Sequence, residues 1–187
     1  MNRASVGSWA RVEPGAGELI GGLIRLAETR ELEQHVLAEL RVLLEEAFAG
    51  DFSEHDWQHA LGGTHALAYE DDELVGHGSV VPRQLVHDGR PLRTGYVEGM
   101  AVRPDRRRRG HGAAVMSALE DVIRARYEVG ALAATDEAVP FYRGRGWIRW
   151  TGPTDPDGEG AVYMLAAAED VNPAGMLVAD WREGELW

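Results

Sequence analysis

The sequence contains no cysteine and no lysine. Without cysteine there is no disulfide, no thiolate nucleophile and no cysteine-ligated metal. Without lysine there is no Schiff-base nucleophile and no phosphate-loop lysine. The 19 basic residues are all arginine, and the 31 acidic residues outweigh them to give a formal net charge of -12. This acidic balance argues against a nucleic-acid partner and favours a cationic one.

Long apolar runs are also missing. No stretch approaches the roughly 20 apolar residues of a membrane-spanning helix, so no membrane partner is expected. The first 18 residues are small, polar and turn-prone and lack the apolar core of a secretory signal. We expect residues 1–18 to be a flexible leader and the protein to be soluble and cytoplasmic.

The remaining chain, residues 19–187, is long enough for one domain and shows neither an internal repeat nor a linker. Apolar spacing close to 3.6 residues predicts helices over 31–50 and 112–127. Two shorter helices are expected over 51–63, where Ser53 and Asp56 fit a capping box, and around 137–146. β-compatible runs between turn signals predict strands at 23–27, 65–70, 74–86, 92–102, 130–135, 147–150 and 161–168. The predicted fold class is α/β, a mixed sheet with helices on its faces.

The most unusual stretch is RPDRRRRGHGAA, residues 103–114, which places five arginines within seven positions. A strand is expected to end at Val102 and a helix to begin after the glycines Gly110 and Gly112. Unpaired N–H groups and the positive helix end would then face the turn. Such a turn is an anion cradle of diphosphate size, with guanidinium groups beside it. The alternative is a solvated basic turn or a nucleic-acid patch.

The pattern Arg107-x-x-Gly110-x-Gly112 between a strand and a helix resembles the acetyl-coenzyme A loop of the GNAT (GCN5-related N-acetyltransferase) superfamily. The segments DFSEHDW, GYVEGMAV, FYRGRGW, GPT and DWREGELW resemble the aminoglycoside 2'-N-acetyltransferase family within it. The resemblance runs from about Leu19 to Trp187. It implies the GNAT fold, with a mostly antiparallel sheet that is splayed at the acetyl-coenzyme A site, and a homodimer.

The resemblance also implies how the coenzyme is held. A backbone N–H in the strand GYVEGMAV, at Met100, is expected to bind the thioester oxygen and stabilise the oxyanion. Main-chain contacts are also expected from Val102. The loop itself contributes Arg107, Arg108, Arg109, Gly110, His111 and Gly112. Acetyl-coenzyme A is thus the expected co-substrate.

Two residues are expected to move protons. Glu98 is an ionisable group inside an apolar strand, and by resemblance it is the general base, acting directly or through water. Its alternative role is a structural carboxylate satisfied by a backbone N–H or an arginine. Tyr142, in the segment FYRGRGW, is by resemblance the acid that protonates the coenzyme thiolate. It could equally be a packing residue beside Phe141.

Carboxylates are expected to recognise the cationic acceptor through charge-assisted hydrogen bonds. By resemblance the tail folds back and offers its terminal carboxylate. The predicted substrate-binding residues are Asp51, Asp56, Glu98, Glu159, Glu185 and Trp187. Two departures from the family pattern stand out: alanines at 133 and 134 replace serines, and Gly158 interrupts consecutive acids.

A metal is not expected. His55 and His59 have the i, i+4 spacing of a chelating pair, but no HExxH motif surrounds them and no third ligand is evident. A solvated helix face explains them better.

The resemblance therefore implies an enzyme that transfers acetyl from acetyl-coenzyme A to the 2'-amino group of aminoglycosides by direct attack in a ternary complex. Because one fold serves many amines, the acceptor could instead be another small polyamine, an amino sugar or a protein N-terminus. A non-catalytic acyl-coenzyme A sensor is the alternative from another functional class.

Overall fold

The computed structural model describes residues 9–10, 23–156, 161–166 and 171–187. The chain forms two compact units, which we call unit 1 (residues 1–79 and 99–119) and unit 2 (residues 80–98 and 120–187). The boundaries between them fall inside regular elements, because β4 (Glu73–His87), β5 (Arg90–Val102) and α3 (His111–Arg126) each contribute residues to both. That residues 19–187 form a single domain behind a leader stays a prediction.

Unit 1 is built on neighbouring strands in the order β1-β2-β3-β4. Strand β2 pairs with β3 in antiparallel register along its whole length. The elements that lie wholly in unit 1 are β1 (Trp9–Ala10), β2 (Leu23–Glu28), η1 (Thr29–Glu31), α1 (Gln34–Ala47), α2 (Glu54–Ala60), β3 (Thr64–Glu70) and η2 (Pro104–Arg106). The predicted helices and strands are thus present here, and the two-residue strand β1 is an addition.

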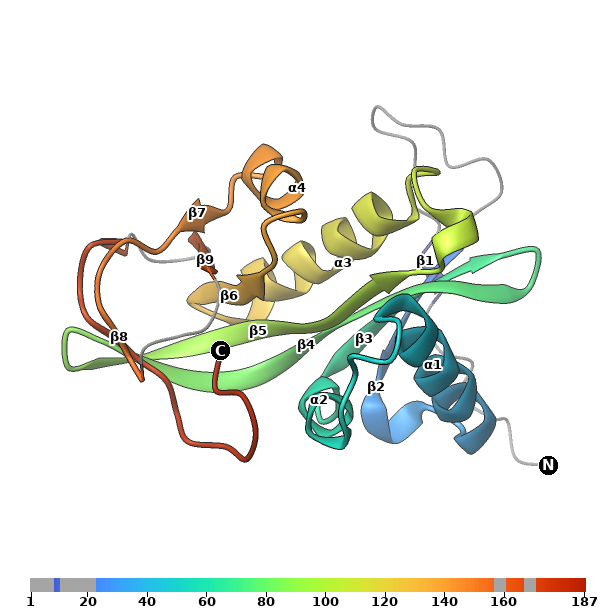
Figure 1. Cartoon of the computed structure of the whole chain (residues 1–187), viewed down its shortest axis with the longest axis horizontal. Helices are drawn as coiled ribbons and strands as arrows, with labels where there is room; N and C mark the ends of the chain where they lie inside the picture. The colour runs from blue at the N-terminus through green and yellow to red at the C-terminus, as the bar shows by residue number, and fades with distance from the viewer. Residues whose placement is uncertain (1–8, 11–22, 157–160, 167–170) are drawn as a thin grey trace. The chain divides into compact units, whose positions relative to one another are not determined.

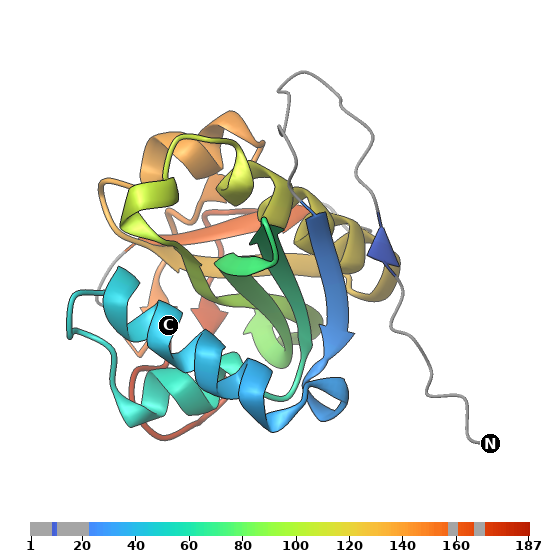
Figure 2. The same cartoon turned by 90° about the vertical axis from the view of Figure 1, so that its right-hand side faces the viewer.

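Helices α1 and α2 lie beside each other against the strands of unit 1 (Figures 1 and 2). The apolar stripe of α1 is buried at Val36, Leu40 and Leu43, as its 3.6-residue spacing predicts, and it packs in one cluster with Trp57 of α2. The capping box of α2 is also confirmed: the Asp56 N–H donates to Ser53 Oγ over 3.2 Å, and the Ser53 N–H donates to the Asp56 carboxylate over 2.7 Å.

The first half of α3 covers the face of the unit 1 sheet that lies opposite to α1. Successive strand side chains point to opposite faces, so Met100 and Ala101 of β5 must face different neighbours. Ala101 joins the cluster of α1. A Cβ at Gly112 of α3 would lie 3.5 Å from Met100 Cε, and a Cβ at Gly78 of β4 would lie 3.1 Å from Met100 Sδ. Unit 1 is therefore a sheet covered on both faces.

Unit 2 contains the neighbouring strands β5-β6-β9-β7 and the C-terminal tail. Strand β9 pairs antiparallel with β6 and with β7. Its other elements are β6 (Val129–Ala134), α4 (Val139–Gly144), β7 (Ile148–Arg149), β8 (Thr154–Asp155), β9 (Ala161–Ala166) and β10 (Leu177–Val178). The predicted strand over 161–168 is described as far as residue 166. In the described parts of the chain, no helix is long and apolar enough to cross a membrane.

Strands β5 and β6 are parallel and pair over a short stretch only. Their register runs from Thr94 opposite Val129 to Tyr96 opposite Ala131 and stops there. Both strands continue, β5 to Val102 and β6 to Ala134. Other pairings are mostly antiparallel, so the sheet is mixed and flanked by helices, as predicted. The early end of this one pairing is the feature expected of a sheet that is splayed beside β5.

A buried carboxylate fixes the approach of α4 in unit 2. The side chain of Glu120, on α3, is 6% exposed and accepts two hydrogen bonds of 2.8 Å from Arg145, which directly follows α4. It also accepts a 2.9 Å bond from Trp147 Nε1. Paired oxygens and a planar guanidinium give strong orientational preference. Glu120 therefore holds the end of α4 against α3.

Replacing Glu120 by alanine should lower the free energy of unfolding by about 3–5 kcal/mol, because the buried Trp147 N–H and the partly buried Arg145 guanidinium lose this acceptor. Urea unfolding followed by tryptophan fluorescence measures the loss. The matched control is Asp121→Ala on the same helix, whose side chain is 81% exposed and pairs with the exposed Arg124. It should change stability by less than about 0.5 kcal/mol. Equal losses in the two variants would contradict this role of Glu120.

Candidate functional site

The turn between β5 and α3 in unit 1 offers a row of unpaired donors. Within the part of the chain that the structure describes, no N–H group of residues 107–113 donates a backbone hydrogen bond, and the helical bonding starts with the Ala114 N–H to Gly110. Two residues of this turn have positive φ, Gly110 at 92° and Arg108 at 63°. A positive φ costs a non-glycine residue about 1–2 kcal/mol. Strain of this kind often accompanies function.

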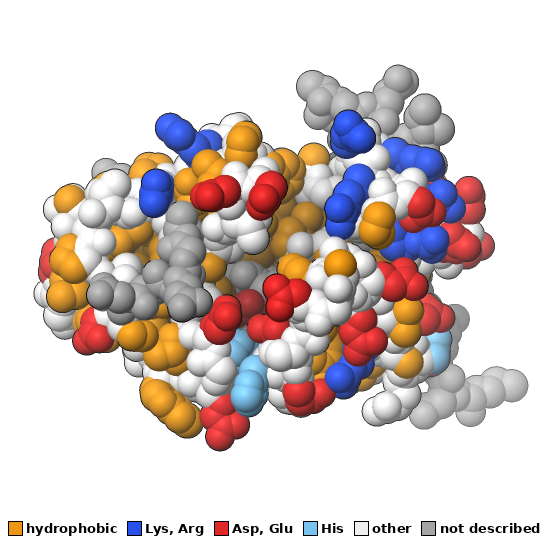
Figure 3. Space-filling model, in the orientation of Figure 1, with side chains coloured by type: hydrophobic (Ala, Val, Ile, Leu, Met, Phe, Trp, Pro, Cys, Tyr) orange, Lys and Arg blue, Asp and Glu red, His pale blue; other side chains and the backbone are white. Residues whose placement is uncertain are grey.

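The arginines of this turn have different partners, all in unit 1. Figure 3 shows their side chains gathered together with carboxylates beside them. Arg106 lies 3.0 Å from a Glu70 oxygen, and Arg109 lies 3.5 Å from the same carboxylate. Arg107 donates to two backbone carbonyls, those of Val102 and Ala47.

Arg108 differs from the other arginines. It is exposed and has no hydrogen bond or ion pair with any described residue. His111 is buried instead, and burial lowers its pKa. Its imidazole therefore points away from solvent, which leaves its backbone N–H as the group that can meet a ligand. Of the predicted anion-binding side chains, Arg108 is the one whose charge is most available.

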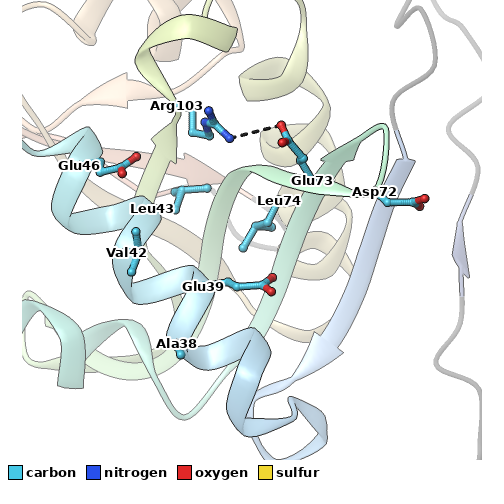
Figure 4. A pocket seen from close by; sticks show the side chains of 9 residues that line it. All are labelled: Ala38, Glu39, Val42, Leu43, Glu46, Asp72, Glu73, Leu74 and Arg103. Carbon is cyan, nitrogen blue, oxygen red and sulfur yellow. Dashed lines mark hydrogen bonds and ion pairs between the residues drawn. The ribbon is translucent and has the colours of Figure 1, made fainter.

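An open groove beside the turn is ruled out as the anion cradle by its charge. Arg103 lines it, and its guanidinium is turned to Glu73 at 3.4 Å (Figure 4). The groove is lined by Ala38, Glu39, Val42, Leu43, Glu46, Asp72, Glu73, Leu74 and Arg103. Four carboxylates against one arginine would repel a diphosphate. The unpaired N–H groups of residues 107–113 are the better cradle.

Strand β5 contains one more residue than β4 between the two ends of their pairing. The turn Asp88–Gly89 has positive φ at both residues, which is the hairpin type that sets His87 opposite Arg90. Farther along, the Arg103 N–H donates to the Val75 carbonyl. From the turn to this bond, β5 is one residue longer than β4. A β-bulge must therefore lie between the two points.

The backbone places this bulge at Gly99, whose φ is 56°. A glycine with positive φ is the usual first residue of such a bulge. Burial along β5 also changes here, because residues 94–97 are all buried and Glu98, Gly99 and Met100 are all partly exposed. The bulge thus interrupts the strand at the two residues that the sequence analysis singled out, Glu98 and Met100.

Glu98 is partly buried in unit 2 and paired with an arginine of the tail. Its Oε1 accepts a 2.5 Å hydrogen bond from Arg182, and both side chains are less than one-fifth exposed. The Arg182 guanidinium also lies over the Tyr96 ring, 5.5 Å from its centroid. The structural alternative for Glu98, a carboxylate satisfied by an arginine, is therefore present in the structure. A bound arginine also positions a carboxylate, so this pairing is compatible with a role as base.

The tail of unit 2 is held in place by Arg83. This buried guanidinium donates to the Asp180 carboxylate over 2.7 Å and to the Leu186 carbonyl over 2.6 Å. The Trp187 side chain is 7% exposed and donates to the Pro156 carbonyl. As the resemblance implied, residues 180–187 fold back onto the unit. Glu185 is exposed, and its backbone carbonyl accepts from Arg182, so one arginine connects Glu98 to this predicted substrate-binding residue.

Tyr142 of α4 is buried in unit 2 at 6% exposure. Its ring packs edge-on against Phe141 and Trp147, and burial raises its pKa to about 12. The phenol is therefore protonated at neutral pH and has a proton to donate. Both predicted roles, packing and proton donation, are compatible with this position.

Of the other predicted substrate-binding residues, Asp51 and Asp56 lie at the start of α2. Asp56 uses its carboxylate to cap α2, while Asp51 is exposed just before that helix and makes no side-chain bond with a described residue. Both belong to unit 1. Glu159 lies outside the described residues. In the described ranges, no group of three histidine or acidic side chains forms a metal site.

The sequence did not predict the residues that support Glu98 and the tail in unit 2, nor those that support the bulge in unit 1. Arg182 and Arg83 reach partners more than 80 positions away, and no spacing rule relates them. The histidines at 65 and 77 are fully buried. They carried a signal, because each interrupts an apolar strand segment and so had to be paired inside.

Residues 17–147 match the Acetyltransferase (GNAT) family. The chain belongs to this family. A curated relative, the aminoglycoside 2'-N-acetyltransferase of Mycolicibacterium fortuitum, is 40% identical over 184 residues, which cover 89% of this chain and 94% of the relative. The family assignment makes the protein an acetyltransferase. The turn at residues 107–113 then has an expected ligand, because GNAT enzymes use acetyl-coenzyme A.

Solved structures agree on the fold. A GNAT acetyltransferase from Brucella melitensis, in complex with acetyl-CoA, has a TM-score of 0.58 at 19% identity over 82% of this chain and 94% of that one. Eis1 from Mycobacterium abscessus has a TM-score of 0.56 at 22% identity over 67% of this chain. The chain spans about a third of Eis1, of which 31% is covered. At these identities the likeness concerns the fold alone.

Arg108→Asn should weaken coenzyme A binding about tenfold, because it removes the most available charge from the anion turn. Thermal stability should not fall, since asparagine tolerates positive φ better than arginine. Isothermal titration and thermal unfolding measure the two effects. The matched control is Arg103→Asn, which removes a guanidinium already paired with Glu73 and Asp105 and should change affinity less than threefold. Equal losses of affinity would contradict this assignment.

Proposed function

We propose that this acetyltransferase transfers the acetyl group of acetyl-coenzyme A to the 2'-amino group of aminoglycosides. The observation that carries the proposal is the 40% identity to the aminoglycoside 2'-N-acetyltransferase of M. fortuitum over nearly the full length of both chains. Exposed or half-buried carboxylates occur in the segments that carry the family resemblance, at Asp51, Glu98 and Glu185. Carboxylates suit an acceptor that carries several ammonium groups.

Glu98 is the proposed general base. The acceptor binds as an ammonium ion and must lose a proton before its nitrogen can attack. Glu98 takes this proton directly or through one water, and Arg182 holds its carboxylate in place. A well-placed base is worth about 10²–10⁴-fold in rate. Since the chain has no cysteine, a relay through an acyl-cysteine is excluded and the amine attacks the thioester itself.

The Met100 N–H is the proposed oxyanion donor, and Tyr142 the proposed acid. As the amine nitrogen bonds to the thioester carbon, negative charge develops on the carbonyl oxygen, where a fixed N–H donor stabilises it. The C–S bond then breaks and the thiolate takes a proton. The buried phenol of Tyr142 carries its proton at neutral pH and can supply it. The attacking nitrogen loses its second proton as the intermediate collapses, and this proton returns through water to the Tyr142 phenolate. The products are then the amide and the free thiol, with one proton left on Glu98.

A second acceptor class shares every step except recognition. Another small polyamine, an amino sugar or a protein N-terminus would use the same coenzyme turn and the same base. The distinction lies in the position of the amine on the acceptor, which the 2'-amino proposal fixes and the alternatives do not.

Paired aminoglycosides test the acceptor. With acetyl-coenzyme A, thiol release should be fast for an aminoglycoside with a 2'-amino group and at least about a hundredfold slower for one with a 2'-hydroxyl, because a missing reactive group leaves only less well-placed amines. Mass spectrometry and NMR of the product should place one acetyl group on N2'. Equal turnover of the two compounds, or of neither, would overturn the 2'-specific proposal.

Glu98→Gln should lower kcat about 10²–10³-fold while coenzyme A affinity stays within a factor of about two. The amide oxygen can still accept the bond from Arg182, so the fold around β5 is retained. Steady-state kinetics and isothermal titration measure the two quantities, with Asp121→Asn as an exposed-carboxylate control. If the Glu98 variant lost coenzyme A affinity together with thermal stability, the carboxylate would be structural instead.

A further inference from the structure

Two histidines form a buried hydrogen-bonded chain inside unit 1. His65 of β3 and His77 of β4 are both 0% exposed. His65 Nδ1 lies 2.9 Å from His77 Nε2, and His77 Nδ1 lies 2.8 Å from the carbonyl oxygen of Gly99, at the bulge of β5. At the other end, His65 Nε2 lies 2.7 Å from Thr29 Oγ1. The chain therefore joins a hydroxyl at the end of β2 to the bulge.

The positions of the protons in this chain follow from its last acceptor. A carbonyl oxygen carries no proton, so His77 Nδ1–H must be the donor to Gly99. In a neutral imidazole the other nitrogen is then bare, and His77 Nε2 accepts from His65 Nδ1–H. His65 Nε2 is bare in turn and accepts from the Thr29 hydroxyl. This hydroxyl also lies 3.2 Å from the Gly63 carbonyl, and its one proton goes to His65 Nε2 at the shorter distance of 2.7 Å. Thr29 itself accepts from the Gly62 N–H over 2.8 Å. All the donors point the same way, toward Gly99.

Both rings are neutral in the folded protein. Burial lowers the pKa of His65 to about 4. Burial, and then the neighbouring His65, lowers the pKa of His77 to about 3. At neutral pH each imidazole therefore carries one proton, which is what the one-directional chain requires.

The Gly99 carbonyl and the Met100 N–H belong to the same peptide group. In a planar trans peptide these two bonds point in opposite directions, so a donor that fixes the carbonyl also fixes the direction of the N–H. A hydrogen bond accepted by the carbonyl also polarises the amide and makes its N–H a better donor, an effect of about 10–30% per bond in a chain. The histidine chain thus binds the carbonyl side of this peptide group, while the Met100 N–H on the other side stays directed at a ligand.

We propose that His77, supported by His65 and Thr29, is a positioning residue that orients and polarises the Met100 N–H as the donor to the thioester oxygen of acetyl-coenzyme A. This inference deepens the proposed function and rests on its assignment of Met100 as the oxyanion donor. Neither histidine is exposed, so neither contacts the coenzyme or the acceptor directly, and both act through the Gly99–Met100 peptide.

The bulge explains why such support is needed. At Gly99 the regular pairing of β5 is interrupted, and the positive φ of this glycine gives its peptide more freedom than an ordinary strand residue has. The surroundings are close, because a Cβ on Gly99 would lie 3.3 Å from His77 Cε1 and 3.4 Å from Ala60 Cβ. His77 therefore supplies both the wall and the hydrogen bond that hold one orientation.

Variants at His77 separate the hydrogen bond from the packing. In His77→Asn the amide nitrogen can take the place of Nδ1 and keep the bond to Gly99, whereas in His77→Gln it reaches to the place of Nε2 instead. We expect kcat to fall roughly tenfold or more in His77→Gln and His77→Leu and less than threefold in His77→Asn, because removing an oxyanion donor outright costs about 10²–10³-fold. KM for the acceptor and Kd for coenzyme A should stay within a factor of about two.

A matched control removes a different buried hydrogen bond of unit 1. Ser79 Oγ donates to the Ala60 carbonyl over 2.8 Å, and Ser79→Ala should lower the melting temperature without lowering kcat. If Ser79→Ala and His77→Gln lost kcat in proportion to their lost stability, the histidine would be merely structural and the proposal would be overturned.

Spectroscopy tests the proposal without an acceptor. The carbonyl stretch of acetyl-coenzyme A labelled with ¹³C at the thioester carbon should move to lower frequency on binding to the wild-type protein and His77→Asn. It should return part-way in His77→Gln. Nitrogen-15 NMR of the wild-type protein should show both histidines protonated at Nδ1, which checks the chain even where a variant fails to fold. His77 protonated at Nε2, or a carbonyl stretch unchanged among the variants, would overturn the proposal.

These readouts distinguish failure of this inference from failure of the proposed function. If no aminoglycoside is acetylated but the carbonyl stretch responds to His77 as expected, the acceptor assignment is wrong and the inference holds. If aminoglycosides are acetylated and the stretch ignores His77, the inference is wrong and the proposed function holds.

Discussion

The extra residue that β5 inserts at Gly99 is the constraint on which the rest of this site depends. A regular strand would alternate its side chains and commit its N–H groups to neighbours. The bulge instead leaves Glu98, Gly99 and Met100 partly exposed in succession. Each of these residues then needs support from elsewhere in its unit. Arg182 of the tail provides it for Glu98, and His77 provides it for the Gly99–Met100 peptide.

Charge is organised locally within the acidic chain. In unit 1 the carboxylates of Glu70, Glu73 and Asp105 pair with most of the arginines between 103 and 109, so the basic run is far less positive than its sequence suggests. Arg108 and the row of backbone N–H groups remain for an anion. In unit 2, Arg83 binds the Asp180 carboxylate and the Leu186 carbonyl of the tail, and Arg182 of the tail binds Glu98. The donor-rich turn of unit 1 suits the anionic coenzyme that GNAT enzymes use.

The elements that depend on local sequence patterns could be predicted from the sequence. Periodicity located α1 and α3, the Ser53–Asp56 spacing located the cap of α2, and turn residues bounded β3, β4 and β5. The glycines and arginines of residues 107–112 predicted the donor-rich turn before α3. Long-range pairs were out of reach, because nothing local relates Arg182 to Glu98 or His65 to His77. The bulge at Gly99 was also missed, since a single glycine inside a strand does not reveal which residue of the partner it opposes.

The Met100 N–H is the proposed donor to the reacting carbonyl, and a crystal structure of the protein with a non-transferable thioether analogue of acetyl-coenzyme A tests this most directly. We expect the analogue's carbonyl oxygen within about 3 Å of the Met100 nitrogen, with the Gly99 carbonyl still bonded to His77. An analogue bound in the turn before α3 with its carbonyl oxygen on another donor, or with the Gly99–Met100 peptide turned away from His77, would contradict it.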